Sequence, residues 1–144
     1  MTHGFDTSLL VAHEVACHDW HAGARKRVAT LRNAGNHFAL AAQGVTEFIH
    51  IVTDARRFSA PLTMEQALER VRAWWDSPDV ERIEPDEAAL KWFLDAMAKH
   101  QLGRKRVLDT MLAATYRSAG ITSLLTLNPA DFAVFEEFSC LGVV

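Results

Sequence analysis

Residues 106–132, RVLDTMLAATYRSAGITSLLTLNPADF, contain the clearest helix and strand signals of the chain. Asp109 begins a segment in which apolar side chains recur one turn apart, and Gly120 is a typical helix stop. These signals predict a helix over residues 109–119. The short apolar run at residues 123–127 predicts a buried strand. A helix that leads directly into such a strand is typical of a parallel sheet covered by helices.

The rest of the chain repeats this alternation of helices and short strands. Thr63, with Gln66 three places later, forms a capping-box pattern, and Asp86 is a good N-cap residue. Further helices are predicted over residues 8–16, 20–33, 45–56, 63–76 and 87–99. Further strands are predicted through Phe5 and over residues 38–42, 80–84 and 140–144. The sequence therefore predicts one α/β domain over residues 1–144, with three layers and a short, mostly parallel sheet between helices.

Helical periodicity also predicts which side chains face the core. The inward positions are expected to be Met64, Leu68, Val71 and Trp75 in one helix and Leu90, Phe93, Leu94 and Met97 in the next. Trp74 and Trp92 are then expected at the surface, where they could pack on a partner protein.

Composition excludes several classes of protein. The 15 Lys and Arg against 18 Asp and Glu give a net charge of −3, which is too acidic to coat nucleic acid by bulk charge. Hydrophobic residues make up 49% of the chain, which excludes disorder as the main state. Two cysteines cannot build a disulfide framework, and no apolar run is long enough for a membrane span. The first residues lack the pattern of a signal peptide, so we expect a cytoplasmic protein.

Acidic residues fall where predicted strands end or helices begin. They are Asp6, Glu47, Asp109 and one of Asn128 or Asp131. Ligands in parallel sheets bind at the carboxyl ends of the strands, so these side chains are expected to converge. Clustered carboxylates repel one another unless a cation lies between them, and all-oxygen ligands suit Mg²⁺ or Mn²⁺. Such an ion generates hydroxide near neutral pH and stabilises charge on a phosphate.

Each acid also has a simpler interpretation. Asp6 and Asp109 could be ordinary N-caps, and Glu47 could be a solvated helix residue. Spacing alone does not decide between these interpretations and a metal site.

The chain resembles the PIN-domain ribonucleases, and most closely the VapC-type toxins of bacterial toxin–antitoxin pairs. Residues 109–120 look like the family's Asp-x-x-x-Ala-Ala helix with its glycine, and residues 126–132 look like its Thr-x-Asn-x-x-Asp-Phe turn. The opening at Asp6 is similar to the family's Asp-Thr-Asn-Val-Leu, with Ser8 in place of the asparagine. Glu47, in Thr-Glu-Phe, looks like the glutamate that follows the second strand.

The resemblance implies a PIN-like fold and a Mg²⁺- or Mn²⁺-dependent endoribonuclease that cuts structured RNA such as tRNA or rRNA. Asp6, Glu47 and Asp109 would bind the metal, and Asn128 or Asp131 would complete the catalytic set. The resemblance also implies a homodimer and inhibition by a cognate VapB-like antitoxin. In the family, helices comparable to residues 45–56 and 63–76 bind the antitoxin. The alternative is a PIN-like module that binds RNA or a partner without turnover, which Asn128 in the fourth acidic position favours slightly.

Two further clusters have both a functional and a plain interpretation. Arg104, Lys105 and Arg106 precede Asp109 and are candidates for contacts to RNA phosphates, or they form a solvated loop. His13, Cys17 and His21 are spaced to share a helix face and could bind zinc. Because Asp19-Trp20 is expected to break the helix, surface histidines at a helix corner are the favoured interpretation.

Overall fold

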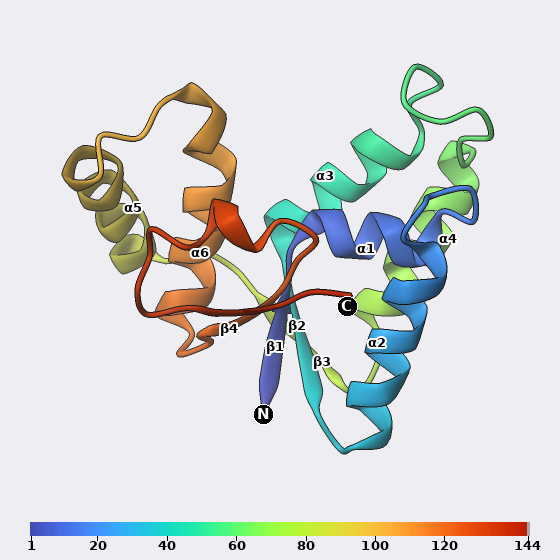
Figure 1. Cartoon of the computed structure of the whole chain (residues 1–144), viewed down its shortest axis with the longest axis horizontal. Coiled ribbons are helices and arrows are strands. Elements are labelled where there is room, and N and C mark those ends of the chain that lie inside the picture. Colours follow the sequence, from blue (N-terminus) through green and yellow to red (C-terminus); the bar gives the residue numbers. More distant parts are fainter. Residues whose placement is uncertain (144) are drawn as a thin grey trace.

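The computed structural model describes residues 1–143, in which helices and strands alternate along the chain (Figure 1). The elements are β1 (Thr2–Phe5), α1 (Thr7–Glu14), α2 (His21–Asn33), β2 (His37–Ala41), α3 (Ala42–Val52), α4 (Met64–Trp75), β3 (Val80–Ile83), α5 (Glu87–Lys99), α6 (Val107–Ser118), β4 (Ser123–Leu125) and β5 (Ser139–Leu141). Two 3₁₀ turns, η1 (Arg104–Arg106) and η2 (Pro129–Asp131), precede α6 and follow β4. Each element overlaps a predicted segment; of the predicted strand 140–144, Val144 lies outside the described residues.

The five strands form one sheet in the order β3-β2-β1-β4-β5, and every neighbouring pair is parallel. Helices α1 to α4 cover one face of this sheet, and α5 and α6 cover the other (Figure 1). The predicted α/β, three-layer fold is therefore confirmed. No helix of the described residues is long and apolar enough to cross a membrane.

Side chains of the central strands alternate between two cores. In β2, Phe38 and Leu40 belong to the core beneath α1 to α4, and Ala39 and Ala41 belong to the core beneath α6. This period of two is the geometry of a strand buried on both faces.

Tyr116 of α6 fills the space that Gly4 leaves on β1. A Cβ atom at Gly4 would lie 2.9 Å from carbons of the Tyr116 ring, which is shorter than any normal contact. The tyrosine is fully buried and is one of the largest side chains in the core. A glycine in the middle of a strand is explained here by the close approach of a neighbouring ring.

The Tyr116 hydroxyl is inserted between β1 and β2. The His37 N–H donates to the Met1 carbonyl at 2.9 Å, and the same series two steps along would join Ala41 to Phe5. The hydroxyl takes that place instead, because it donates to the Phe5 carbonyl at 2.6 Å and accepts from the Ala41 N–H at 3.3 Å. The ends of the two strands are therefore held apart at the point where Asp6 and α3 leave the sheet.

The predicted inward face of α4 is confirmed at Val71 and at Trp75, which is partly buried against the core, and is wrong at Met64 and Leu68, which are exposed. Ala67, Val71 and Trp74 are the buried positions, and the Trp74 ring packs edge-on against Phe5 at 5.0 Å. Leu68 is 40% exposed. Adjacent helical positions differ by about 100° around the axis, so both faces satisfy the periodicity and only the packing against the sheet selects one.

The predicted inward face of α5 is wrong at Leu90 and Leu94, whereas Phe93 and Met97 are half-buried. Its buried residues are Ala89 and Ala96, while Leu90 and Leu94 are 51% and 59% exposed. Small residues on this face allow α5 to approach α6 closely. Trp92, expected at the surface, packs against the ring of Phe135 at a centroid distance of 5.4 Å.

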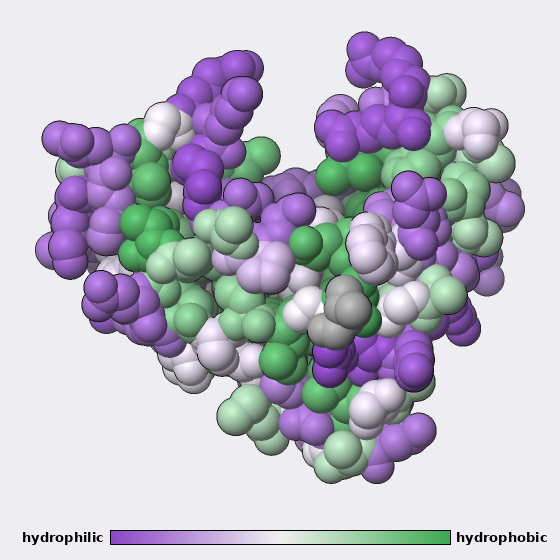
Figure 2. All heavy atoms as spheres, viewed as in Figure 1, coloured by the Kyte–Doolittle hydropathy of each residue, from purple (hydrophilic) through white to green (hydrophobic). Residues whose placement is uncertain are grey.

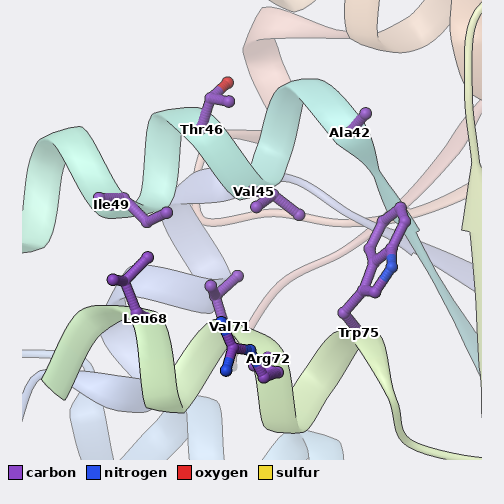
Figure 3. Close-up of a pocket in the computed structure, with 8 residues that line it drawn as sticks. All are labelled: Ala42, Val45, Thr46, Ile49, Leu68, Val71, Arg72 and Trp75. Atoms are coloured by element: carbon purple, nitrogen blue, oxygen red, sulfur yellow. The ribbon is translucent and has the colours of Figure 1, made fainter. Parts of the chain in front are cut away.

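An apolar groove of about 380 Å³ lies between α3 and α4 (Figure 3). Val45 and Ile49 of α3 face Leu68 and Val71 of α4 across it, and Trp75 stands at one end. The exposed Leu68 is therefore one of the side chains that line this groove. Thr46 points away from α4.

Tyr116→Phe is expected to lower the free energy of unfolding by about 1–3 kcal/mol, because it leaves the buried Phe5 carbonyl and Ala41 N–H without their partner. The phenyl ring still fills the space, so the strands cannot close. Urea unfolding measures the effect. Ser118→Ala is the matched control, since the buried Ser118 hydroxyl has no hydrogen-bond partner among the described residues. Equal stability of Tyr116→Phe and wild type would contradict this role of the hydroxyl.

Candidate functional site

The carboxyl ends of three adjacent strands open into one cavity of about 480 Å³. Asp6 follows β1, α3 begins directly after β2, and Asn128 follows β4. In the space-filling view a deep notch separates the arm formed by α5 and α6 from the arm that carries α3 and α4 (Figure 2). All five predicted acid and amide residues line the cavity: Asp6, Glu47, Asp109, Asn128 and Asp131.

Asp6 is buried and held by two hydroxyl groups. Its Oδ2 accepts hydrogen bonds from Thr126 Oγ1 at 2.6 Å and from Ser8 Oγ at 2.8 Å. Those hydroxyls accept in turn from the backbone N–H groups of Asn128 and Leu127. Both bonds to Asp6 fall on the same oxygen, so neither hydroxyl engages Oδ1. Ser8, which departs from the asparagine of the resemblance, thus still supports the acid.

Neither Asp6 nor Asp109 caps a helix with its side chain. Asp6 occupies the N-cap position of α1 but makes no capping bond, and the N-cap of α6 is Arg106. Asp109 is the third residue of α6. The interpretation of these acids as ordinary caps is therefore wrong.

Glu47 of α3 is held by one side chain of α1 and by one side chain of its own helix. Its Oε2 accepts from Thr7 Oγ1 at 3.2 Å, and its Oε1 accepts from Gln43 Nε2 at 2.6 Å. Gln43 Nε2 also donates to the Leu108 carbonyl at 2.8 Å, which links α3 to the residue before Asp109. The sequence analysis missed Gln43, although its spacing of four from Glu47 is the spacing of contacting residues on a helix.

Only one member of the predicted basic cluster contacts the acids. Arg106 Nη1 lies 3.7 Å from Asp131 Oδ1, whereas Arg104 and Lys105 are exposed on η1. Two other Arg106 nitrogens, Nε and Nη2, are buried with no hydrogen-bond partner among the described residues. Arg106 is the cluster member with donors directed into the protein near Asp131.

The structure resembles solved VapC and VapBC structures over nearly its full length. VapC20 from Mycobacterium tuberculosis, described as a toxin that cleaves the Sarcin-Ricin loop, aligns with a TM-score of 0.72 and 16% identity over 94% of this chain and 95% of that chain. The chain has the VapC fold. VapBC2 from Rickettsia felis, bound to a fragment of promoter DNA, aligns with a TM-score of 0.70 and 15% identity over 99% and 98% of the two chains.

VapBC-5 from Mycobacterium tuberculosis, described as a member of the VapBC family of toxin–antitoxin systems, aligns with a TM-score of 0.56, 17% identity and 98% coverage of both chains. No family model and no curated protein matches the sequence. The VapC fold is therefore identified by comparison of structures, whose sequences are only 15–17% identical to this chain.

Burial and like charges raise the pKa of two acids of this cavity, Asp6 and Asp109. Burial is the main cause for Asp6, opposed by its hydrogen bonds from Thr126 and Ser8. The pKa of Asp109 rises to about 6, chiefly through burial and then through the negative charges of Asp6 and Asp131. A cation among these carboxylates would relieve both costs.

The donor set suits a hard cation that keeps part of its water shell. Among residues 1–143, no three His, Cys, Asp or Glu side chains are grouped closely enough to form a complete metal site. Mg²⁺ is usually bound by one or two carboxylates together with water and phosphate oxygens, and does not need such a cage. Asp6 and Asp109, whose charges interact, are the pair that best fits this description.

The zinc interpretation of His13, Cys17 and His21 fails. Helix α1 ends at Glu14, and His13 Nδ1 is bonded to the Glu14 carboxylate at 2.8 Å. His21 Nδ1 donates to the Ala12 carbonyl at 2.9 Å, and Cys17 is exposed.

Asp109→Asn is expected to stabilise the metal-free protein at pH 8 and to have no such effect near pH 4. The pKa of Asp109 is raised in the folded state, so the cost of its charge appears as pH rises through about 6. After allowance for solvent screening of this half-exposed group, we expect about 1 kcal/mol, or ~2–4 °C in Tm.

Thermal unfolding in EDTA at pH 4 and pH 8 measures this effect. Glu136→Gln, at an exposed position away from the cavity, removes the same charge and is the control. A stabilisation of Asp109→Asn that is equal at both pH values would show that the repulsion is not its cause.

Proposed function

We propose that the protein is a metal-dependent endoribonuclease of the VapC toxin type, which cleaves phosphodiester bonds of structured RNA such as tRNA or rRNA in the cytoplasm. One observation carries the proposal. Asp6, Glu47 and Asp109, from three separate segments, line a single cavity at the carboxyl edge of a sheet with the VapC fold.

Asp6 and Asp109 would hold Mg²⁺ or Mn²⁺, with Glu47 bound directly or through water. The ion would supply a hydroxide near neutral pH and charge stabilisation at the phosphate. The raised pKa values of Asp6 and Asp109 support this assignment. A bound cation would offset the burial and the mutual repulsion that make their charged forms unfavourable.

The chain's own residues would orient the reaction. Thr126 and Ser8 fix the plane of the Asp6 carboxylate by holding Oδ2. Thr7 and Gln43 hold the two oxygens of Glu47, which positions this group to orient the attacking water and accept its proton.

The remaining cavity residues would act on the substrate. Asn128 or Asp131 would complete the catalytic set from the turn after β4. Arg106 lies beside the cavity, with Nη1 3.7 Å from Asp131 Oδ1, and is therefore the member of the cluster Arg104, Lys105 and Arg106 that we assign to a phosphate oxygen.

The groove between α3 and α4 would receive a VapB-like antitoxin. Its facing apolar side chains, with Leu68 40% exposed, suit the apolar face of a partner helix (Figure 3). The VapBC assemblies among the structural neighbours support this assignment. A homodimer is proposed on the resemblance to the family alone.

The purified protein, freed of any antitoxin, is expected to cut total cellular RNA into discrete fragments with Mg²⁺ or Mn²⁺ and not with EDTA. Asp6→Asn should reduce the rate by about 10²–10³-fold, the scale on which one lost electrostatic group acts on a transition state. Gel analysis of the fragments, with their ends mapped, gives the rate and the cut site.

Glu136→Gln is the control for the loss of one negative charge and should cleave like wild type. RNA binding without cleavage in either metal would reject the nuclease and favour the module without turnover.

A further inference from the structure

One half of the cavity has no role in the proposed chemistry. Besides the acids, the cavity is lined by His18 and Trp20 from the loop between α1 and α2, and by Arg57 and Phe58 from the loop between α3 and α4. This grouping could not be predicted from the sequence, because about 40 residues separate His18 from Phe58.

One aromatic ring from each loop comes close to the other in this half of the cavity. The rings of His18 and Phe58 are 6.4 Å apart between centroids and tilted by 45°. Phe58 packs against the core, which supports it from behind. The Trp20 side chain is 49% exposed although it lines the cavity. Phe58 is therefore backed by the core, and Trp20 is accessible to a ligand.

Polar groups at the same place are oriented to donate. The Trp20 backbone N–H donates to His18 Nδ1 at 3.0 Å, so Nδ1 is the acceptor and Nε2 carries the hydrogen of the neutral ring. The Nε atom of Arg57 lies 3.6 Å from Asp54 Oδ2, and the Arg57 side chain is 58% exposed. The aromatic half thus combines accessible ring faces with two groups that donate hydrogen bonds.

A flat, uncharged ring attached to a phosphate fits this combination. The ring faces suit base stacking, which is independent of base identity, and Arg57 suits a phosphate oxygen. A base inside a duplex is paired and stacked on both faces and cannot enter such a cavity. A protein partner is the less suitable ligand for this cavity. The apolar groove that suits a partner helix lies elsewhere, between α3 and α4.

We propose that His18, Trp20 and Phe58 form a nucleobase subsite, which holds one unpaired base of the RNA beside the acidic centre while Arg57 contacts a neighbouring phosphate. The subsite rests on the proposed function for its substrate and adds the requirement that the cut lies next to an unpaired base. Its position within the same cavity as Asp6 and Asp109 joins base recognition to the scissile bond.

Binding is measured without turnover, in an Asp6→Asn background with EDTA. The probes are fluorescein-labelled single-stranded RNA decamers of uridine or adenosine, a duplex of the two, and a decamer of abasic residues. Trp20→Ala should weaken binding of both single strands by about 5- to 100-fold. It should leave the duplex and the abasic strand unchanged, because neither presents a free base.

Three further variants separate stacking from folding. Trp20→Phe should restore most of the affinity, since it keeps an aromatic face. Phe58→Ala should act like Trp20→Ala, and circular dichroism shows whether this partly buried position still folds. Leu90→Ala, at an exposed position on α5, is the control and should bind like the parent.

Equal loss of affinity for the abasic strand would overturn the subsite, because the contact would then be to the backbone. Unchanged RNA affinity in Trp20→Ala, with weakened binding of an arginine-rich peptide, would also overturn it in favour of a protein ligand. Metal-dependent cleavage whose KM is unaffected by Trp20→Ala would reject the subsite and leave the nuclease standing. Trp20-dependent binding without cleavage would support the subsite and reject the nuclease.

Discussion

The architecture of the site depends on a hydroxyl group placed inside a parallel sheet. Tyr116 reaches from α6 through the space left by Gly4 and joins the Phe5 carbonyl to the Ala41 N–H in place of a direct bond. Asp6 follows Phe5, and α3 with Glu47 follows Ala41, so the hydroxyl sets how the two acid-bearing segments leave the sheet. The same helix carries Asp109. One side chain therefore connects the three segments that carry the acids.

The cavity is a region of unfavourable electrostatics within an otherwise well-packed protein. Asp6 is buried, and Asp109 has a pKa raised to about 6 by burial and by its acidic neighbours. Hydrogen bonds from Thr126 and Ser8 stabilise Asp6 but do not remove the repulsion. Residues that destabilise the free protein are typical of functional sites, because binding of the proper ligand reverses the cost.

Signals that are local in sequence predicted the helices and strands well. Contacts between distant parts of the chain were harder to predict. Asp86 gave the start of α5, since a capping bond is local in sequence. The inward faces of α4 and α5 were only partly right because two apolar stripes one residue apart satisfy the same periodicity. In α4 the packing of Trp74 on Phe5 decides between them. The acids were found because strand ends meet at one sheet edge. His18 and Phe58 were not found, since only the folded loops bring them together.

Asp6 and Asp109 are proposed as the core of a cation site, and Mn²⁺ binding is the first property to measure. The electron paramagnetic resonance signal of free Mn²⁺ reports how much ion the protein takes up during a titration at pH 7.5, without RNA or turnover. We predict saturable binding by wild type and an affinity at least about 10-fold weaker in both Asp6→Asn and Asp109→Asn. Equal Mn²⁺ binding by wild type and both variants would contradict this proposal.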